Sequence, residues 1–329
     1  MFYLNLIILL VSSLIGLYIN LIISKKFDLF DYPDKKKIHS AKTPNIGGLA
    51  IILVLFISFI IFDYTYEKLI IFSLSIIIIL IGFIDDLINF KASSKLLLIS
   101  IPVGIFVYNI SSVQSLGSFF GYDLNLGNLS FIFTFLCMLL LINATNYMDG
   151  IDGLISLLAI ISFVGIMILV PIYEWSSLIP ILIFLIIFLF FNFGILPKQF
   201  LGDSGSLGVG FLLSSLSIYY TQINNYINPT IIIWFLSFYV FEFLTINIIR
   251  LKNKKNLFEK DLNFIFNILQ NKVGKINTLL VCCVLKLFFI LNGLIINYFK
   301  LYDVSILIFI IYFFIYLFLR IKQSKKFIY

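Results

Sequence analysis

The sequence predicts an all-α membrane protein with about eleven transmembrane helices. Of its 329 residues, 61% are hydrophobic and only 12% are charged, and the mean hydropathy is +1.11. A soluble domain is apolar over only about 45–50% of its residues. The apolar runs approach the roughly 20 helical residues that cross about 30 Å of hydrocarbon, and they lack the alternation of barrel strands.

Eleven apolar stretches divide the chain, which is expected to form one integral membrane domain over residues 1–329. They lie at 2–23, 45–62, 69–84, 97–112, 129–145, 153–170, 178–196, 206–221, 228–249, 277–297 and 303–320. Helices are the expected form, because a single apolar segment in lipid must satisfy its backbone groups internally. The first stretch has no basic segment before it and no small-residue cleavage site, so we expect it to remain as an anchor.

The distribution of lysine and arginine predicts the orientation of these helices. The loops on one side, together with the C-terminal tail, hold 20 of the 23 basic residues; these loops are 24–44, 85–96, 146–152, 197–205 and 250–276. Short cytoplasmic loops carry such a positive excess, so the N-terminus is predicted outside and the C-terminus in the cytoplasm. The same loops account for the net charge of +7. They indicate membrane lipid, and no nucleic acid, as the partner of this surface.

Five aspartates in three glycine-punctuated clusters all fall on this predicted cytoplasmic side. Asp85 and Asp86 end one span and differ by about 100° of helical rotation, so we expect them to serve different partners. One carboxylate would bind a metal or activate a nucleophile, and the other would orient a neighbouring group. Lys95 follows nine residues after Asp86 and is expected to meet a phosphate as a point charge. The alternative is a solvated helix end.

The second and third clusters offer hard oxygen ligands of the kind that Mg²⁺ prefers. Asn146, Asp149 and Asp152 share one turn, with glycine directly after each aspartate. Asp203 lies where the next span begins, and the free N–H groups of a helix start commonly hold phosphate. The structural alternatives are a polar turn for the second cluster and a helix cap for Asp203.

Residues of the first long loop complete the candidate set. Lys37 and the sole histidine, His39, lie in a string that ends in the glycine pair Gly47-Gly48, where close backbone approach is expected. An ordinary positive-inside signal is the alternative for the lysines. The acids occur without a serine–histidine pair or thiolate ligands, which favours metal-assisted phosphoryl chemistry at the inner face.

In order along the chain, these motifs resemble the polyprenyl-phosphate N-acetylhexosamine-1-phosphate transferases, a family that includes phospho-N-acetylmuramoyl-pentapeptide transferase. The motifs are Asp-x-Pro-x-x-x-Lys-x-His, Pro-x-x-Gly-Gly, Gly-x-x-Asp-Asp, Asn-x-x-Asp-Gly-x-Asp-Gly-Leu and Gly-Asp-Ser-Gly-Ser, spread over residues 31 to 270. The resemblance implies transfer of a sugar 1-phosphate from a UDP-sugar such as UDP-N-acetylglucosamine to undecaprenyl phosphate, with release of UMP. It also implies a multi-pass protein of the bacterial inner membrane that starts a cell-envelope glycan such as lipopolysaccharide O-antigen. A homodimer is left open.

Roles carried over from the resemblance distinguish the clusters. Asp203 and Asn146 would bind Mg²⁺, with Mn²⁺ as the alternative ion, and Asp85 would act as base or nucleophile. The residues implied to orient the metal or to contact the nucleotide and phosphates are Asp86, Asp149, Asp152, Lys37, His39 and Lys95.

One loop departs from the family pattern. In the last large cytoplasmic loop, predicted at 250–276, many members carry a histidine cluster. This chain has Asp261, Asn263 and Asn267 in that loop, so Asn263 is expected to take part in donor binding. The alternative function is a catalytically weakened homologue that binds or moves the polyprenyl-phosphate carrier. Two charges inside predicted spans, Glu242 and Lys286, are expected to find tertiary partners.

Overall fold

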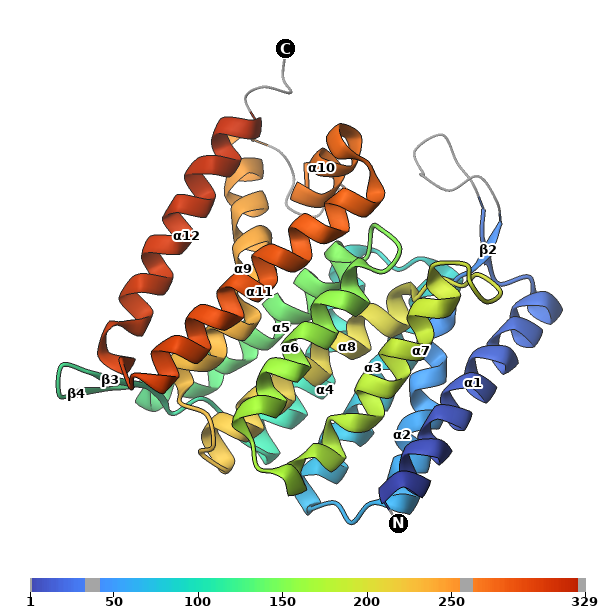
Figure 1. Cartoon of the computed structure of the whole chain (residues 1–329), viewed down its shortest axis with the longest axis horizontal. Coiled ribbons are helices and arrows are strands. Elements are labelled where there is room, and N and C mark those ends of the chain that lie inside the picture. Colours follow the sequence, from blue (N-terminus) through green and yellow to red (C-terminus); the bar gives the residue numbers. More distant parts are fainter. Residues whose placement is uncertain (1, 33–41, 255–262, 325–329) are drawn as a thin grey trace.

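Helices make up nearly all of the regular structure in this computed structural model, which describes residues 2–32, 42–254 and 263–324. The helices are α1 (Phe2–Phe27), α2 (Ala50–Ile61), α3 (Tyr66–Ile88), α4 (Ala92–Asn109), α5 (Ser130–Met148), α6 (Leu154–Leu169), α7 (Ile179–Asn192), α8 (Gly202–Ile218), α9 (Pro229–Lys252), α10 (Ile265–Val273), α11 (Lys275–Tyr298) and α12 (Tyr302–Ser324). Figure 1 shows them as a bundle, with the first and last helices at its two flanks. The all-α fold is therefore confirmed.

Every predicted span coincides with a helix, and the short helix α10 is the additional one. Seven of the described helices are long and apolar enough to cross a membrane: α1, α3, α4, α5, α9, α11 and α12. Three shorter apolar helices are α2, α6 and α7. The chain is thus a multi-pass membrane protein, while the count of eleven crossings and their orientation stay predictions.

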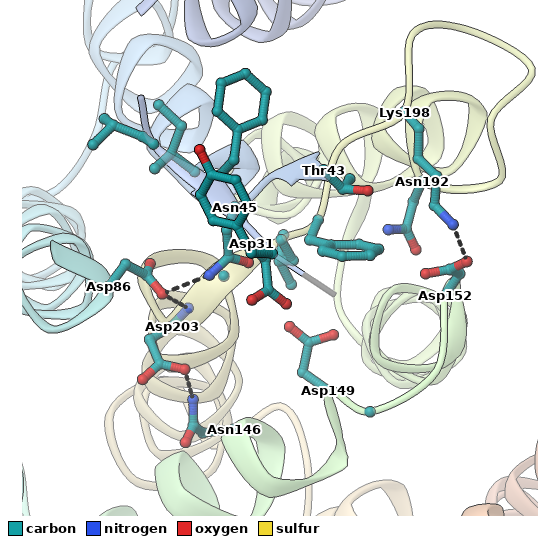
Figure 2. A pocket seen from close by; sticks show the side chains of 18 of the residues that line it. Asp31, Thr43, Asn45, Asp86, Asn146, Asp149, Asp152, Asn192, Lys198 and Asp203 are labelled. Atoms are coloured by element: carbon teal, nitrogen blue, oxygen red, sulfur yellow. Dashed lines mark hydrogen bonds and ion pairs between the residues drawn. The ribbon is translucent and has the colours of Figure 1, made fainter. Parts of the chain in front are cut away.

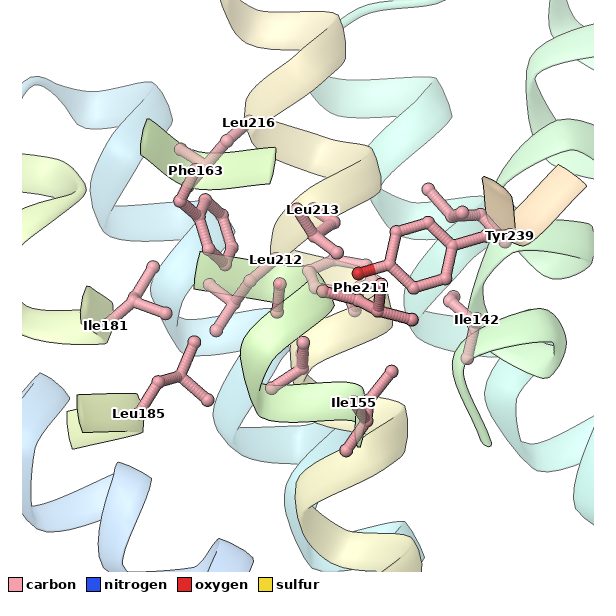
Figure 3. Close-up of a cluster of buried hydrophobic side chains, with 14 of the residues drawn as sticks. Ile142, Ile155, Phe163, Ile181, Leu185, Phe211, Leu212, Leu213, Leu216 and Tyr239 are labelled. Atoms are coloured by element: carbon pink, nitrogen blue, oxygen red, sulfur yellow. The ribbon is translucent and has the colours of Figure 1, made fainter. Parts of the chain in front are cut away.

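Helix α8 lies in the middle of the bundle and packs against α3 and α5. From Ser204 to Ile218 its side chains are all buried. Small residues make this possible, because five serines and four glycines among its 17 residues let neighbouring backbones come close. Figure 3 shows its apolar positions, such as Phe211 and Leu212, surrounded by side chains from α5, α6, α7 and α9. The close packing of α8 sets the position of Asp203 in its first turn.

Two small hairpins lie at opposite ends of the bundle. One pairs β1 (Phe30–Asp31) with β2 (Thr43–Pro44), and the other pairs β3 (Ser115–Phe119) with β4 (Tyr122–Asn125). The β3–β4 hairpin lies at the opposite end from the β1–β2 hairpin (Figure 1). The N-terminus and the last helix's C-terminal end also lie at opposite ends, as an odd number of crossings requires.

The two charges within predicted spans find different partners. Glu242 forms an ion pair with Arg320, 3.1 Å between Oε1 and Nη2. Lys286 donates to the carbonyl oxygen of Phe235, and its ammonium lies 4.4 Å from the centre of the Tyr239 ring. Tertiary partners therefore exist for both, as expected, and Arg320 of the last helix is one of them.

Candidate active site

The five predicted cytoplasmic loops meet around one pocket of about 1020 Å³. Its wall includes Asp28–Tyr32, Thr43, Asn45, Ile46, Asp85–Leu87, Asn89, Asn146, Asp149–Asp152, Asn192, Lys198, Phe200–Asp203, Asn267, Gln270 and Lys275. Figure 2 shows the polar side chains converging on it from separate helices and loops. All five aspartates of the three motif clusters line it, although they are up to 118 residues apart in the chain. The motifs therefore form one site.

Lys95 holds the innermost part of this site together. Its ammonium lies 2.9 Å from Oδ2 of Asp85, 3.2 Å from Oδ1 of Asn146, and in contact with Oδ2 of Asp203. The Asn146 amide donates in turn to Oδ1 of Asp203 at 2.8 Å and to the Ser206 hydroxyl at 2.9 Å. We call Asp85, Lys95, Asn146 and Asp203 the inner cluster. Lys95 thus contacts carboxylates here, where a phosphate contact was predicted.

Asp86 binds a different partner from Asp85, as the helical rotation predicted. Its carboxylate accepts the backbone N–H groups of Asp203 at 3.0 Å and Ser204 at 3.1 Å, and the side-chain amide of Asn45 at 3.0 Å. Two N–H groups at the start of α8 are therefore already satisfied by a carboxylate. Asp86 therefore occupies these two groups in this structure, and phosphate binding at the start of α8 stays a prediction. Asp203 is not the cap of its own helix.

Glycines allow three segments to meet at this point. A Cβ atom on Gly48 would lie 2.1 Å from the Gly205 nitrogen, and one on Gly82 would lie 2.6 Å from backbone atoms of Asp203 and Ser204. No real Cβ atom tolerates such contacts with backbone, so these glycines are required for the packing. The predicted close approach at the glycine pair is confirmed. It brings α3 against the start of α8, and with it Asp86 against its amide partners.

Asp149 follows α5 and points into the pocket opposite the inner cluster. Burial, and then the negative charges of Asp203 and Asp152, raise the pKa of Asp149 to about 7. Figure 2 shows its carboxylate pointing toward that of Asp31 in β1. A carboxyl group in this position can change its protonation state near neutral pH.

Asp152 lies further along the same turn and is bound by two lysines. Its Oδ2 is 2.7 Å from Lys198 Nζ and 2.6 Å from Lys275 Nζ. We call these three residues the outer cluster. Both lysines entered the sequence analysis only as topology markers, since a lysine next to a span carries no further signal without knowledge of its partner.

The remaining predicted residues divide into two groups. Lys37 and His39 lie outside the described residues. Asn263 is described but is not part of the pocket wall, and its carbonyl oxygen accepts from Arg320. Asn267 and Gln270, one and two turns further along on α10, line the pocket in its place. The loop without histidines therefore still contributes polar side chains, from a helix that the sequence did not reveal.

The oxygen atoms around Lys95 suit a hard divalent cation. Those of Asp85, Asn146 and Asp203 already converge on one cationic group, the Lys95 ammonium. Mg²⁺ is usually bound by one or two carboxylates, with water and substrate phosphates completing its shell. Among the described residues, no three His, Cys, Asp or Glu side chains form a complete metal cage. The donor set thus fits an ion that a phosphate-bearing ligand helps to bind.

Comparison with known proteins agrees with this geometry. The family model "Glycosyl transferase family 4" matches residues 68–221, which contain the inner cluster. The chain is similar to this family over the matched segment, which is just under half of its residues. The match confirms the resemblance to polyprenyl-phosphate hexosamine-1-phosphate transferases. Residues 222–329, which include α10, α11 and α12, lie outside the matched segment.

Individual relatives are similar over most of the chain. Undecaprenyl-phosphate alpha-N-acetylglucosaminyl 1-phosphate transferase of Thermotoga maritima is 29% identical over 279 residues, covering 83% of this chain and 84% of the relative. The protein of the same name from Escherichia coli K12 is 26% identical over 261 residues, covering 75% and 70%. The Yersinia pestis protein is 26% identical over 273 residues, covering 78% and 73%.

Proposed function

We propose that this protein moves a hexosamine 1-phosphate from a UDP-sugar to undecaprenyl phosphate and releases UMP. The names of its relatives describe this type of reaction. The observation that carries the proposal is the inner cluster, in which two carboxylates and an amide oxygen surround one cation at the wall of a large polar pocket. Such a site suits two phosphate-bearing substrates, because both need their negative charge balanced.

The reaction exchanges one phosphoanhydride bond for another. An oxygen of the lipid phosphate forms a bond to the sugar-linked phosphorus of the donor, and the bond from that phosphorus to UMP breaks. Asp85, at the end of α3, would accept a proton from the lipid phosphate, while Asp86 holds the α8 start so that Asp203 faces the donor. Positioning and charge stabilisation account for most of the rate in such transfers.

Asp203 and Asn146 would hold Mg²⁺, or Mn²⁺ as the alternative ion. When bound, the ion would neutralise the developing charge on the donor's phosphates. Lys95 would remain beside the same oxygen atoms and carry a second positive charge toward the lipid phosphate. The site would face the cytoplasm from the bacterial inner membrane, where a UDP-sugar is available, and the product would start a cell-envelope glycan.

Release of UMP tests the reaction directly. Membranes containing the protein, given undecaprenyl phosphate, Mg²⁺ and a panel of UDP-hexosamines including UDP-N-acetylglucosamine, should release UMP with at least one donor. A chelator should abolish the release and added Mg²⁺ should restore it. The matched control is Asp123→Asn in β4, an exposed aspartate at the far end of the bundle.

Two results would contradict the proposal in different ways. Release of UMP that persists in chelator would exclude the metal assignment. Absence of release with every donor, together with retained binding of undecaprenyl phosphate, would favour the alternative function of a carrier-binding homologue.

A further inference from the structure

A buried ion pair joins the last helix to the pocket. Glu242 of α9 is fully buried, and Arg320 of α12 is 1% exposed. Arg320 contacts the carboxylate with two nitrogens, Nε to Oε2 at 3.2 Å and Nη2 to Oε1 at 3.1 Å. Tyr316 adds its hydroxyl to Oε2 at 2.5 Å. A buried pair of this kind gains little net stability over apolar residues, because both charges lose their hydration, so its presence calls for another reason.

Both members of the pair also hold the start of α10. Oε1 of Glu242 accepts the backbone N–H of Ile265, the first residue of α10, at 2.5 Å. Arg320 Nη2 donates to the carbonyl oxygen of Asn263, two residues earlier. The first N–H groups of a helix have no partner within it, and a carboxylate satisfies them well. The ion pair therefore holds the start of α10 in place.

Helix α10 forms one wall of the pocket. Asn267 and Gln270 line the cavity, and Lys275 follows at the start of α11. Phe266 packs against the aspartate turn, since a Cβ atom on Gly150 would lie 2.6 Å from its ring. Phe264 lies 6.1 Å from Tyr147, measured between ring centres. A shift of α10 would thus move both this wall and the turn that carries Asp149 and Asp152.

We propose that Glu242 and Arg320 are positioning residues that hold α10 as the donor-binding wall of the pocket. Amide and ammonium groups line this wall, which suits the hydroxyl, amide and phosphate groups of a sugar nucleotide. A polyprenyl chain requires apolar surface instead. This inference rests on the proposed function, and it assigns a role in the reaction to the last helix, beyond the segment matched by the family model.

Steady-state kinetics of a variant in which Glu242 and Arg320 are both replaced test this positioning role. Glu242→Leu combined with Arg320→Met removes both charges, so no unpaired buried charge remains to prevent folding. The KM for the UDP-sugar should rise about tenfold, with kcat and the KM for undecaprenyl phosphate within about twofold, since binding by α10 is lost without loss of the inner cluster. Arg320→Lys, which keeps the charge but not the two-nitrogen contact, should fall between wild type and the double variant.

A second buried ion pair provides the matched control. Lys68 of α3 lies 2.7 Å from Glu174, and both side chains are 6% exposed. This pair is roughly 25 Å along α3 from Asp85, at about 1.5 Å rise per residue. Lys68→Met with Glu174→Leu should lower thermal stability without changing the donor KM. Equal changes of the donor KM in both double variants, or an unchanged KM in the Glu242–Arg320 variant, would overturn the proposal.

A distance measurement tests the same role without catalysis. Spin labels at Asn271→Cys in α10 and Lys91→Cys before α4, both exposed positions, would report the distance across the pocket after the three native cysteines are replaced by alanine. The Glu242–Arg320 double variant should broaden or shift this distance distribution, and the Lys68–Glu174 control should not. An unshifted distribution would overturn the positioning role even if no UMP release is found, whereas absence of UMP release alone would refute only the proposed reaction.

Discussion

The inner and outer clusters use the same residue types with opposite balance of charge. In the inner cluster one lysine serves two aspartates, which leaves one net negative charge, and the Lys95 and Asp85 side chains are 12% and 6% exposed. In the outer cluster two lysines form ion pairs with Asp152, which leaves one net positive charge. Both lysine side chains are 38% exposed. The difference in net charge makes the inner cluster the more favourable site for a cation and the outer cluster the more favourable site for an anion.

Removal of the inner negative charge should have the largest effect. Asp203→Asn eliminates the carboxylate that contacts Lys95 and the proposed metal, and UMP release should fall roughly 1,000-fold by analogy with loss of a charge-stabilising group. Thermal stability measured in parallel should change little. Full activity of this variant would exclude Asp203 from the chemistry, and Asp123→Asn serves as the aspartate control.

Removal of the Asp86 carboxylate, which binds the start of α8, should have the next largest effect. Asp86→Ala leaves the N–H groups of Asp203 and Ser204 without their acceptor, and an unsatisfied buried group costs about 1–3 kcal/mol. Activity should drop by about 100-fold, because small misplacement of a reacting group costs this much. Unlike Asp203→Asn, this variant should also show a clearly lower thermal midpoint. An unchanged midpoint would contradict the structural role of Asp86.

Neutralisation of the outer cluster should affect donor binding more than turnover. Lys198→Gln and Lys275→Gln should each raise the KM for the UDP-sugar severalfold, on the order of 1 kcal/mol for a partly exposed charge. The change should shrink at high salt, because screening weakens exposed charges. The control is Lys300→Gln, an exposed lysine in the α11–α12 connection. A salt-independent KM in wild type would contradict an electrostatic role for the two lysines.

The protonation of Asp149 should give the smallest effect, a pH dependence of stability. Its pKa is raised to about 7 by burial and neighbouring negative charge, above about 3.9 in an unfolded chain. The folded state therefore binds the proton more tightly, so this contribution to stability is present below about pH 4 and is lost as pH rises through about 7. Asp149→Asn should remove that decline. Thermal unfolding of both proteins between pH 5 and 8, in chelator, measures it, and parallel curves would contradict the shift.

Sequence patterns predicted most of the fold and part of the site. The span positions follow from hydropathy alone, and the five aspartates follow from their motifs. Asn45, Lys198 and Lys275 were absent from the predicted site because a lone amide or lysine in a loop has no distinguishing signal. The short helix α10 was also missed, since its nine residues are partly polar and lie in a segment that was read as a loop.

The sequence by itself determined that the chain lies in a membrane, which long apolar segments are helical, and which five aspartates interrupt the apolar sequence. These properties depend on transfer free energy and local spacing, which are carried by the residues themselves. Only the tertiary structure decided that Asp85 binds Lys95, that Asp86 caps α8, and that Arg320 reaches across to Glu242 and α10. These partners are separated by up to 118 residues and are chosen by how glycine-rich helices pack, and no local pattern records that choice.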